Sequence, residues 1–128
     1  MTSIHQEITF DAPPSRVYKT LIDSGEFACF TGAPADISPE EGGAFICFGT
    51  FILGRNIELI PDKRIVQAWR VFNWAEGVYS IVRFDLFDEG GKTRLVMDHT
   101  GVPEDAVGHI DSGWGQKYWE PLRKYLAS

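Results

Sequence analysis

Residues 103–126, with the sequence PEDAVGHIDSGWGQKYWEPLRKYL, decide the fold. Their apolar side chains recur at spacings of three and four residues, which is the period of one face of an α-helix. The stripe consists of Val107, Ile110, Trp114, Tyr118, Leu122 and Tyr125, and Trp119 and Leu126 widen it. The pattern predicts an amphipathic helix of about 23 residues, roughly 34 Å long, which is enough to cross a small domain.

Prolines and acidic residues predict where this helix begins and where it bends. Pro103 suits the first turn, where a missing N–H costs nothing, and Glu104 and Asp105 complement the helix dipole. Pro121 lacks the N–H that the hydrogen-bond ladder needs, so we expect a kink about one turn before it.

Upstream of the helix, strand patterns dominate. Residues 4–10 alternate apolar and polar side chains and predict a first strand. Two short helices follow, one that begins at Pro14 and ends near residue 24, and one over residues 26–30. Further strands are predicted over residues 44–48, 52–60, 64–72, 78–87 and 92–100. This order predicts the α+β class, with residues 1–128 forming a single domain in which a curved antiparallel sheet wraps around the C-terminal helix.

Composition and charge exclude several classes of partner. The chain has 12 Lys and Arg against 18 Asp and Glu, a net charge of −6, which repels phosphate backbones and anionic membranes. The longest nearly apolar run, residues 44–53, has about half of the roughly 20 residues that a spanning helix needs. We expect no nucleic-acid partner and no membrane insertion. The N-terminal residues lack a signal-peptide pattern, so we expect a cytoplasmic location.

The two predicted hairpins determine which side chains face the interior. A two-residue loop at Glu89-Gly90 would place Ser80 opposite His99, with Val82, Phe84, Leu86, Leu95 and Met97 on the same inner face. By the same alternation across the Pro61 turn, Ile57 and Leu59 share a face with Gln67 and Trp69. Glu58 and Arg70 then fall on the outer face, where we expect a solvated ion pair.

A cavity between this inner face and the helix would be mostly apolar with a few polar groups, as ligand sites usually are. The candidate ligand-binding residues are Phe45, Ile57, Leu59, Gln67, Trp69, Ser80, Phe84, Met97, His99, Trp114 and Tyr118. The same residues would also make an ordinary closed core, and the sequence leaves both possibilities open.

Motifs for catalysis, metals and cofactors do not occur. His5, His99 and His109 lie far apart, and Cys29 and Cys47 have no metal-site spacing, so we expect no metal and two free, mostly buried thiols. Gly49 and Gly54 are spaced as in a phosphate loop, but Arg55-Asn56 replaces the required Lys and hydroxyl pair. Ser80 and His99 lack an orienting acid, so we expect a hydrogen-bonded contact, with neutral His99, rather than a catalytic pair. No cofactor and no catalytic residue are predicted.

Four segments of the chain together resemble one family. They read FTGAPADISPEEGGAF from residue 30, GRNIELIPDKRIVQAWRVFNWAEGVYS from 54, TRLVMDHTGVP from 93 and GWGQKYWEPLRKYL from 113. The resemblance covers about residues 4–126 and is to the activator of heat-shock-protein ATPase homologues, within the START-like, birch-allergen-like superfamily. It implies the helix-grip fold and a cavity that in many superfamily members takes an apolar small molecule.

Three functions follow as hypotheses. The first is a non-enzymatic protein that binds a hydrophobic small molecule. The second is an interaction module, or stress-related co-chaperone, that contacts a heat-shock chaperone. The third is an enzyme of the cyclase or dehydrase kind. An enclosed pocket with a titratable group favours the first or third, whereas exposed apolar or charged strips on the outer sheet face favour the second.

Overall fold

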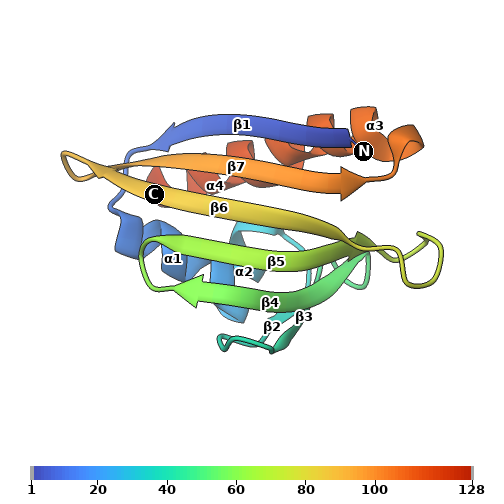
Figure 1. Cartoon of the computed structure of the whole chain (residues 1–128). Coiled ribbons are helices and arrows are strands. Elements are labelled where there is room, and N and C mark those ends of the chain that lie inside the picture. The colour runs from blue at the N-terminus through green and yellow to red at the C-terminus, as the bar shows by residue number, and fades with distance from the viewer. Residues whose placement is uncertain (1, 128) are drawn as a thin grey trace.

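A seven-stranded antiparallel sheet and a long C-terminal helix make up the computed structural model, which describes residues 2–127. The strand order is β1-β7-β6-β5-β4-β3-β2 (Figure 1). The strands are β1 (Thr2–Phe10), β2 (Asp36–Ile37), β3 (Ala44–Cys47), β4 (Ile52–Ile60), β5 (Arg64–Val71), β6 (Ser80–Glu89) and β7 (Lys92–Val102).

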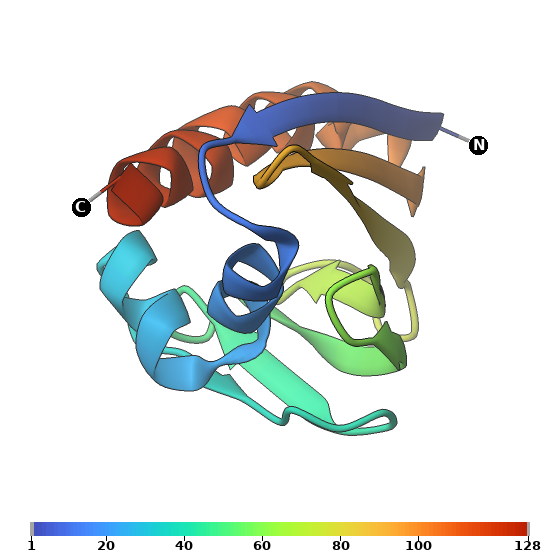
Figure 2. The same ribbon diagram turned by 90° about the vertical axis from the view of Figure 1, so that its left-hand side faces the viewer.

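The helices all lie on one side of the sheet, which curves around them from β1 to β2 (Figure 2). Two short helices, α1 (Pro14–Ile22) and α2 (Ser24–Thr31), follow the first strand. The C-terminal helix consists of η1 (Glu104–Ala106), α3 (Val107–Gly113), η2 (Trp114–Trp119) and α4 (Glu120–Ala127) in unbroken succession. The predicted α+β fold with a sheet gripping the last helix is confirmed.

The C-terminal helix changes its hydrogen bonding one turn before Pro121. The segment η2 is π-helical, and the Glu120 N–H donates to the Gly115 carbonyl, five residues back. Pro121 has no N–H, and its ring crowds the carbonyl four residues earlier, so the regular ladder cannot pass through this turn. The sequence predicts a kink at this place, and the structure shows a π-helical segment there.

The β6–β7 hairpin turns at Gly90-Gly91, so the predicted loop at Glu89-Gly90 is wrong. Both glycines have positive φ, 69° and 88°, and the Asp88 carboxylate accepts a hydrogen bond from the Gly91 N–H at 3.0 Å. A tight hairpin turn with two positive φ angles favours two glycines. His99 therefore pairs with Val82 rather than Ser80. Because the pairing shifts by two residues, every side chain keeps its predicted face.

Strand β4 contains a β-bulge that the alternating pattern does not reveal. The register of β4 against β5 shifts between Asn56 and Glu58, so Ile57 is the extra residue. Ile57 is 50% exposed, and its predicted inner position is wrong. Asn56 is buried instead, opposite Gln67, whose amide donates to the Asn56 Oδ1 at 3.2 Å.

The interior of the domain is a closed core. Side chains from the inner sheet face, among them Val82, Phe84, Leu95 and Met97, are at most 2% exposed. The C-terminal helix places Trp114, Tyr118 and Leu122 in the same core cluster. Most of the residues predicted to line a cavity are packed in this core, and three of them, Trp69, Trp114 and Tyr118, also line an open pocket.

Replacement of Trp114 by alanine is expected to be among the costliest single changes in the domain. Trp114 is 2% exposed, and deletion of a large buried aromatic ring costs about 3–5 kcal/mol of unfolding free energy. Glu120→Ala, on the exposed side of the same helix, is expected to stay within about 0.5 kcal/mol. Denaturant titration measures both, and equal effects would show that the buried face is assigned wrongly.

Candidate functional site

The residues predicted to line a cavity mostly fill the core. Nine of the eleven are at most 7% exposed, while Leu59 is half-buried and Ile57 is exposed. The nine are Phe45, Gln67, Trp69, Ser80, Phe84, Met97, His99, Trp114 and Tyr118. Three of them, Trp69, Trp114 and Tyr118, also line an open pocket. A role of the eleven in ligand binding stays a prediction.

His99 lies at the centre of a buried chain of hydrogen bonds. The Trp114 indole N–H donates to His99 Nδ1 at 3.1 Å, and His99 Nε2 lies 2.7 Å from Ser80 Oγ. The Ser80 hydroxyl donates to the Trp69 carbonyl at 2.8 Å. Since Nδ1 accepts, the network assigns the neutral tautomer with hydrogen on Nε2, which donates to Ser80.

Burial keeps this imidazole uncharged. His99 is fully buried, and the cost of desolvating its charged form lowers the pKa to about 3. A second ring proton on Nδ1 would also face the Trp114 N–H. His99 therefore serves as a neutral bridge between the C-terminal helix, β6 and β7. The predicted Ser80–His99 contact is present, although the two residues lie diagonally across the hairpin.

An open pocket lies between the β3–β4 connection and the C-terminal helix. Its volume is about 630 Å³, within the range of roughly 300–1,000 Å³ typical of small-molecule sites. It is lined by Phe48, Phe51, Ile52, Trp69, His109, Ile110, Ser112, Gly113, Trp114, Gln116, Lys117 and Tyr118. The wall from the β3–β4 connection is apolar, whereas the exposed polar groups all come from the helix.

Two backbone irregularities occur at this pocket. Phe48 has a positive φ of 54°, a conformation that costs a bulky residue about 1–3 kcal/mol. Contacts with Phe27 and Tyr118, whose rings lie 5.8 and 5.4 Å away, hold it there. The π-helical segment η2 supplies Trp114, Gln116, Lys117 and Tyr118 from the other side. Such departures from regular geometry concentrate at functional sites.

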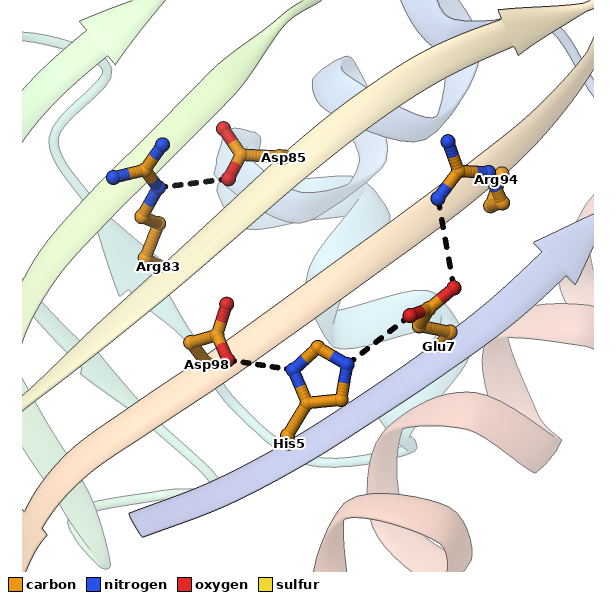
Figure 3. Close-up of polar contacts among 6 residues, drawn as sticks. All are labelled: His5, Glu7, Arg83, Asp85, Arg94 and Asp98. Atoms are coloured by element: carbon orange, nitrogen blue, oxygen red, sulfur yellow. Dashed lines mark hydrogen bonds and ion pairs between the residues drawn. The ribbon is translucent and has the colours of Figure 1, made fainter.

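The outer face of the sheet carries a strip of ion pairs, which we call the charged strip: His5, Glu7, Glu58, Arg64, Arg83, Asp85, Glu89, Arg94 and Asp98. His5 uses both ring nitrogens, with Nδ1 2.6 Å from Asp98 and Nε2 3.1 Å from Glu7 (Figure 3). These hydrogen bonds, that of Asp98 above all, raise the pKa of His5. Arg94 links Glu7 to Glu89, and Arg83 pairs with Asp85.

The sequence suggests an ion pair between Arg70 and Glu58, but the structure shows other partners for both residues. The Arg70 guanidinium is buried and donates to backbone carbonyls of the β5–β6 loop, including Trp74 at 2.6 Å and Ala75 at 3.1 Å. Glu58 instead lies 3.4 Å from Arg64. Arg70 therefore holds the loop rather than the sheet surface.

The thiols differ from each other. Cys47 is buried and its pKa is raised by burial to about 12, but Cys29 is exposed, so the expectation of two buried thiols is wrong for Cys29. Within residues 2–127, no three His, Cys, Asp or Glu side chains come together in a group that could hold a metal ion. Over the same residues, no helix has both the length and the apolar character to span a membrane.

Comparison with known proteins identifies the family. The sequence model of the family described as "Activator of Hsp90 ATPase homolog 1-like protein" matches residues 11–127. The chain belongs to this family. Its resemblance to activators of heat-shock-protein ATPases, visible in the sequence, is thereby confirmed.

Curated members of the Hsp90 ATPase activator family are similar over most of this chain. The Activator of 90 kDa heat shock protein ATPase homolog of Dictyostelium discoideum is 35% identical over 116 residues, which cover 89% of this chain and 30% of that protein. Activator of 90 kDa heat shock protein ATPase homolog 1 of Homo sapiens is 29% identical over 116 residues, which cover 91% of this chain and 34% of that protein. The chain thus spans about a third of the length of these relatives.

Two solved structures of similar length share the fold. The crystal structure of an HSP90 activator from Plasmodium falciparum superposes with a TM-score of 0.94 at 22% identity, covering 99% of this chain and 97% of that chain. The solution structure of the Aha1 dimer from Colwellia psychrerythraea gives 0.83 at 19% identity, covering 98% and 96%. At these identities the likeness shows the fold.

Charging of His99 is expected to unfold the domain rather than occur within it. Because the folded pKa of about 3 lies below the ordinary value of 6.5, the unfolded chain binds more protons between these pH values. Stability from this group is complete above pH 6.5 and falls below it, by up to about 1.4 kcal/mol per pH unit. NMR of the imidazole nitrogens should show the Nε2–H tautomer with no titration near pH 6.5.

The Trp114→Phe variant provides the matched control for this prediction. It keeps an aromatic ring but removes the N–H that occupies His99 Nδ1, so we expect a higher His99 pKa. A solvent-like midpoint for His99 in the unaltered protein would contradict the network.

Proposed function

We propose that this domain is a protein-interaction module that contacts an ATPase of the 90-kDa heat-shock class through the outer face of its sheet. The observation that carries the proposal is the charged strip, which is solvent-facing and extends across β1, β7, β6, β5 and β4. Its arginines and carboxylates alternate in sign, and such surfaces fix the register of a partner and speed encounter more than they add affinity.

Apolar side chains interleave with these charges and would supply binding energy. Ile57, Ile81 and Phe87 are between 40% and 50% exposed on β4 and β6. The Arg94 guanidinium lies 4.5 Å from the centre of the Phe87 ring, which orders both side chains. Aromatic residues and arginine are the types enriched in the energetically dominant centres of interfaces.

The relatives support the choice of partner. The named proteins from Dictyostelium discoideum and Homo sapiens are activators of the 90-kDa heat-shock ATPase, and the Plasmodium falciparum structure of matching length is an HSP90 activator. A cytoplasmic location, where such an ATPase would be met, stays a prediction, as does the enzyme hypothesis.

The strip is tested by reversing its charge. Arg83→Glu combined with Arg94→Glu should raise the concentration of this protein needed for half-maximal binding to a cognate Hsp90-class ATPase about tenfold or more. Lys19→Glu combined with Lys124→Glu makes the same charge change on α1 and α4, on the helix side of the sheet, and should leave binding unchanged. Calorimetry and ATPase rates at low and high salt measure the effect.

The outcomes separate the partner from the surface. If the unaltered protein binds the ATPase and the arginine double variant binds it equally well, the charged strip is not the contact surface. No binding of the unaltered protein to the ATPase would contradict the proposed function itself.

The pocket supports a second function, the binding of a small apolar molecule. Its floor of Trp69, Trp114 and Tyr118 offers aromatic surface, and its size suits such a ligand. Three of the predicted cavity residues, Trp69, Trp114 and Tyr118, belong to its lining, which supports the first hypothesis.

A neutral aromatic probe should bind this pocket at one site per chain. We expect N-phenyl-1-naphthylamine to bind saturably and to quench the emission of Trp69 or Trp114. The variant Ser112→Trp places a large side chain at the lining and should abolish binding while the fold persists in circular dichroism. Unchanged binding by Ser112→Trp would place the probe elsewhere on the protein.

A further inference from the structure

The lining of the pocket contains a basic residue but no acidic one. None of its twelve lining residues is Asp or Glu, although the chain contains 18 of these residues. Lys117 brings a full positive charge to the lining and makes no ion pair within residues 2–127. In a protein of net charge −6, a basic pocket without acidic residues selects the sign of its ligand.

The polar groups are confined to one side of the pocket. His109, Ser112, Gln116 and Lys117 all belong to the C-terminal helix, whereas the facing wall consists of Phe48, Phe51 and Ile52. A ligand that satisfies both sides must itself be two-sided. Its body would cover the aromatic wall and floor, and its polar group would face the helix.

The polar group that fits best is an anion. Lys117 offers an ammonium group that makes no ion pair with a carboxylate of residues 2–127, and Ser112 and Gln116 add hydroxyl and amide donors to the same lining. Charge-assisted hydrogen bonds to an anion are roughly twice as strong as neutral ones. Lys117 is exposed, so solvent and salt screen the attraction between its ammonium group and a bound anion, which limits the gain in affinity.

From these contacts we infer that the pocket binds an amphipathic anion, a molecule with an apolar, ring-sized body and a single acidic group held by Lys117. The inference rests on the proposed second function and names the chemical class of its ligand. Irregular backbone at Phe48 and in η2 places the apolar wall and the lysine on opposite sides of one pocket.

Two probes that differ only in the acidic group test the inference. 8-Anilinonaphthalene-1-sulfonate carries the aryl body of N-phenyl-1-naphthylamine plus one sulfonate. We expect the sulfonate to bind at one site per chain and at least about fivefold more tightly than the neutral probe at low salt, with the advantage shrinking as salt rises.

Lys117→Met removes the charge while keeping the length of the side chain. It should weaken sulfonate binding about five- to tenfold and leave neutral-probe binding within about twofold. Lys124→Met is the matched control, because Lys124 lies on the same helix outside the pocket, and it should change neither.

The outcomes distinguish the two levels of the proposal. If both probes bind saturably with equal affinity and Lys117→Met changes neither affinity, the preference for an anion is wrong. The pocket would then still be a site for apolar ligands. Failure of both probes to saturate would overturn the pocket as a ligand site. Sulfonate binding that Ser112→Trp does not reduce would place the anion elsewhere and overturn the inference as well.

Discussion

The packing of the Trp114 indole is the interaction on which the rest of the structure depends. Its ring stacks against Trp69 of β5 at 5.8 Å and against Trp119 at 5.4 Å, with interplanar angles of 29° and 17°. Its N–H donates to His99 of β7. A single side chain thus fixes the C-terminal helix against the middle of the sheet in both rotation and height. The same side chain is part of the lining of the open pocket.

The faces of the strands could be predicted from the sequence, although their register could not. Side chains alternate with a period of two, so a shift of two residues leaves every face unchanged. Moving the turn from Glu89-Gly90 to Gly90-Gly91 produced such a shift, and the contact between Ser80 and His99 survived it. The bulge at Ile57 is different, because one extra residue reverses the faces on one side of it.

The open pocket lay beyond the reach of pattern analysis for a physical reason. Periodicity reports which side chains point inward, but it does not report whether they fill the space between sheet and helix. Trp69, Trp114 and Tyr118 were predicted correctly as inward, and the pocket they line depends on two further features. One is the left-handed backbone at Phe48, and the other is the π-helical turn, of which Pro121 gave a partial signal.

A closed core between two surfaces also bears on how they communicate. Coupling between distant sites requires an element with two arrangements that both sites bias. Trp69 is the natural bridge, because its ring lines the pocket while its carbonyl accepts the Ser80 hydroxyl within the sheet. Its neighbours Trp114 and His99 are fully buried and joined by a hydrogen bond, so the surroundings of Trp69 are tightly packed. The pocket lining and the charged strip share no residue, so we expect substitutions at each to add in their effects.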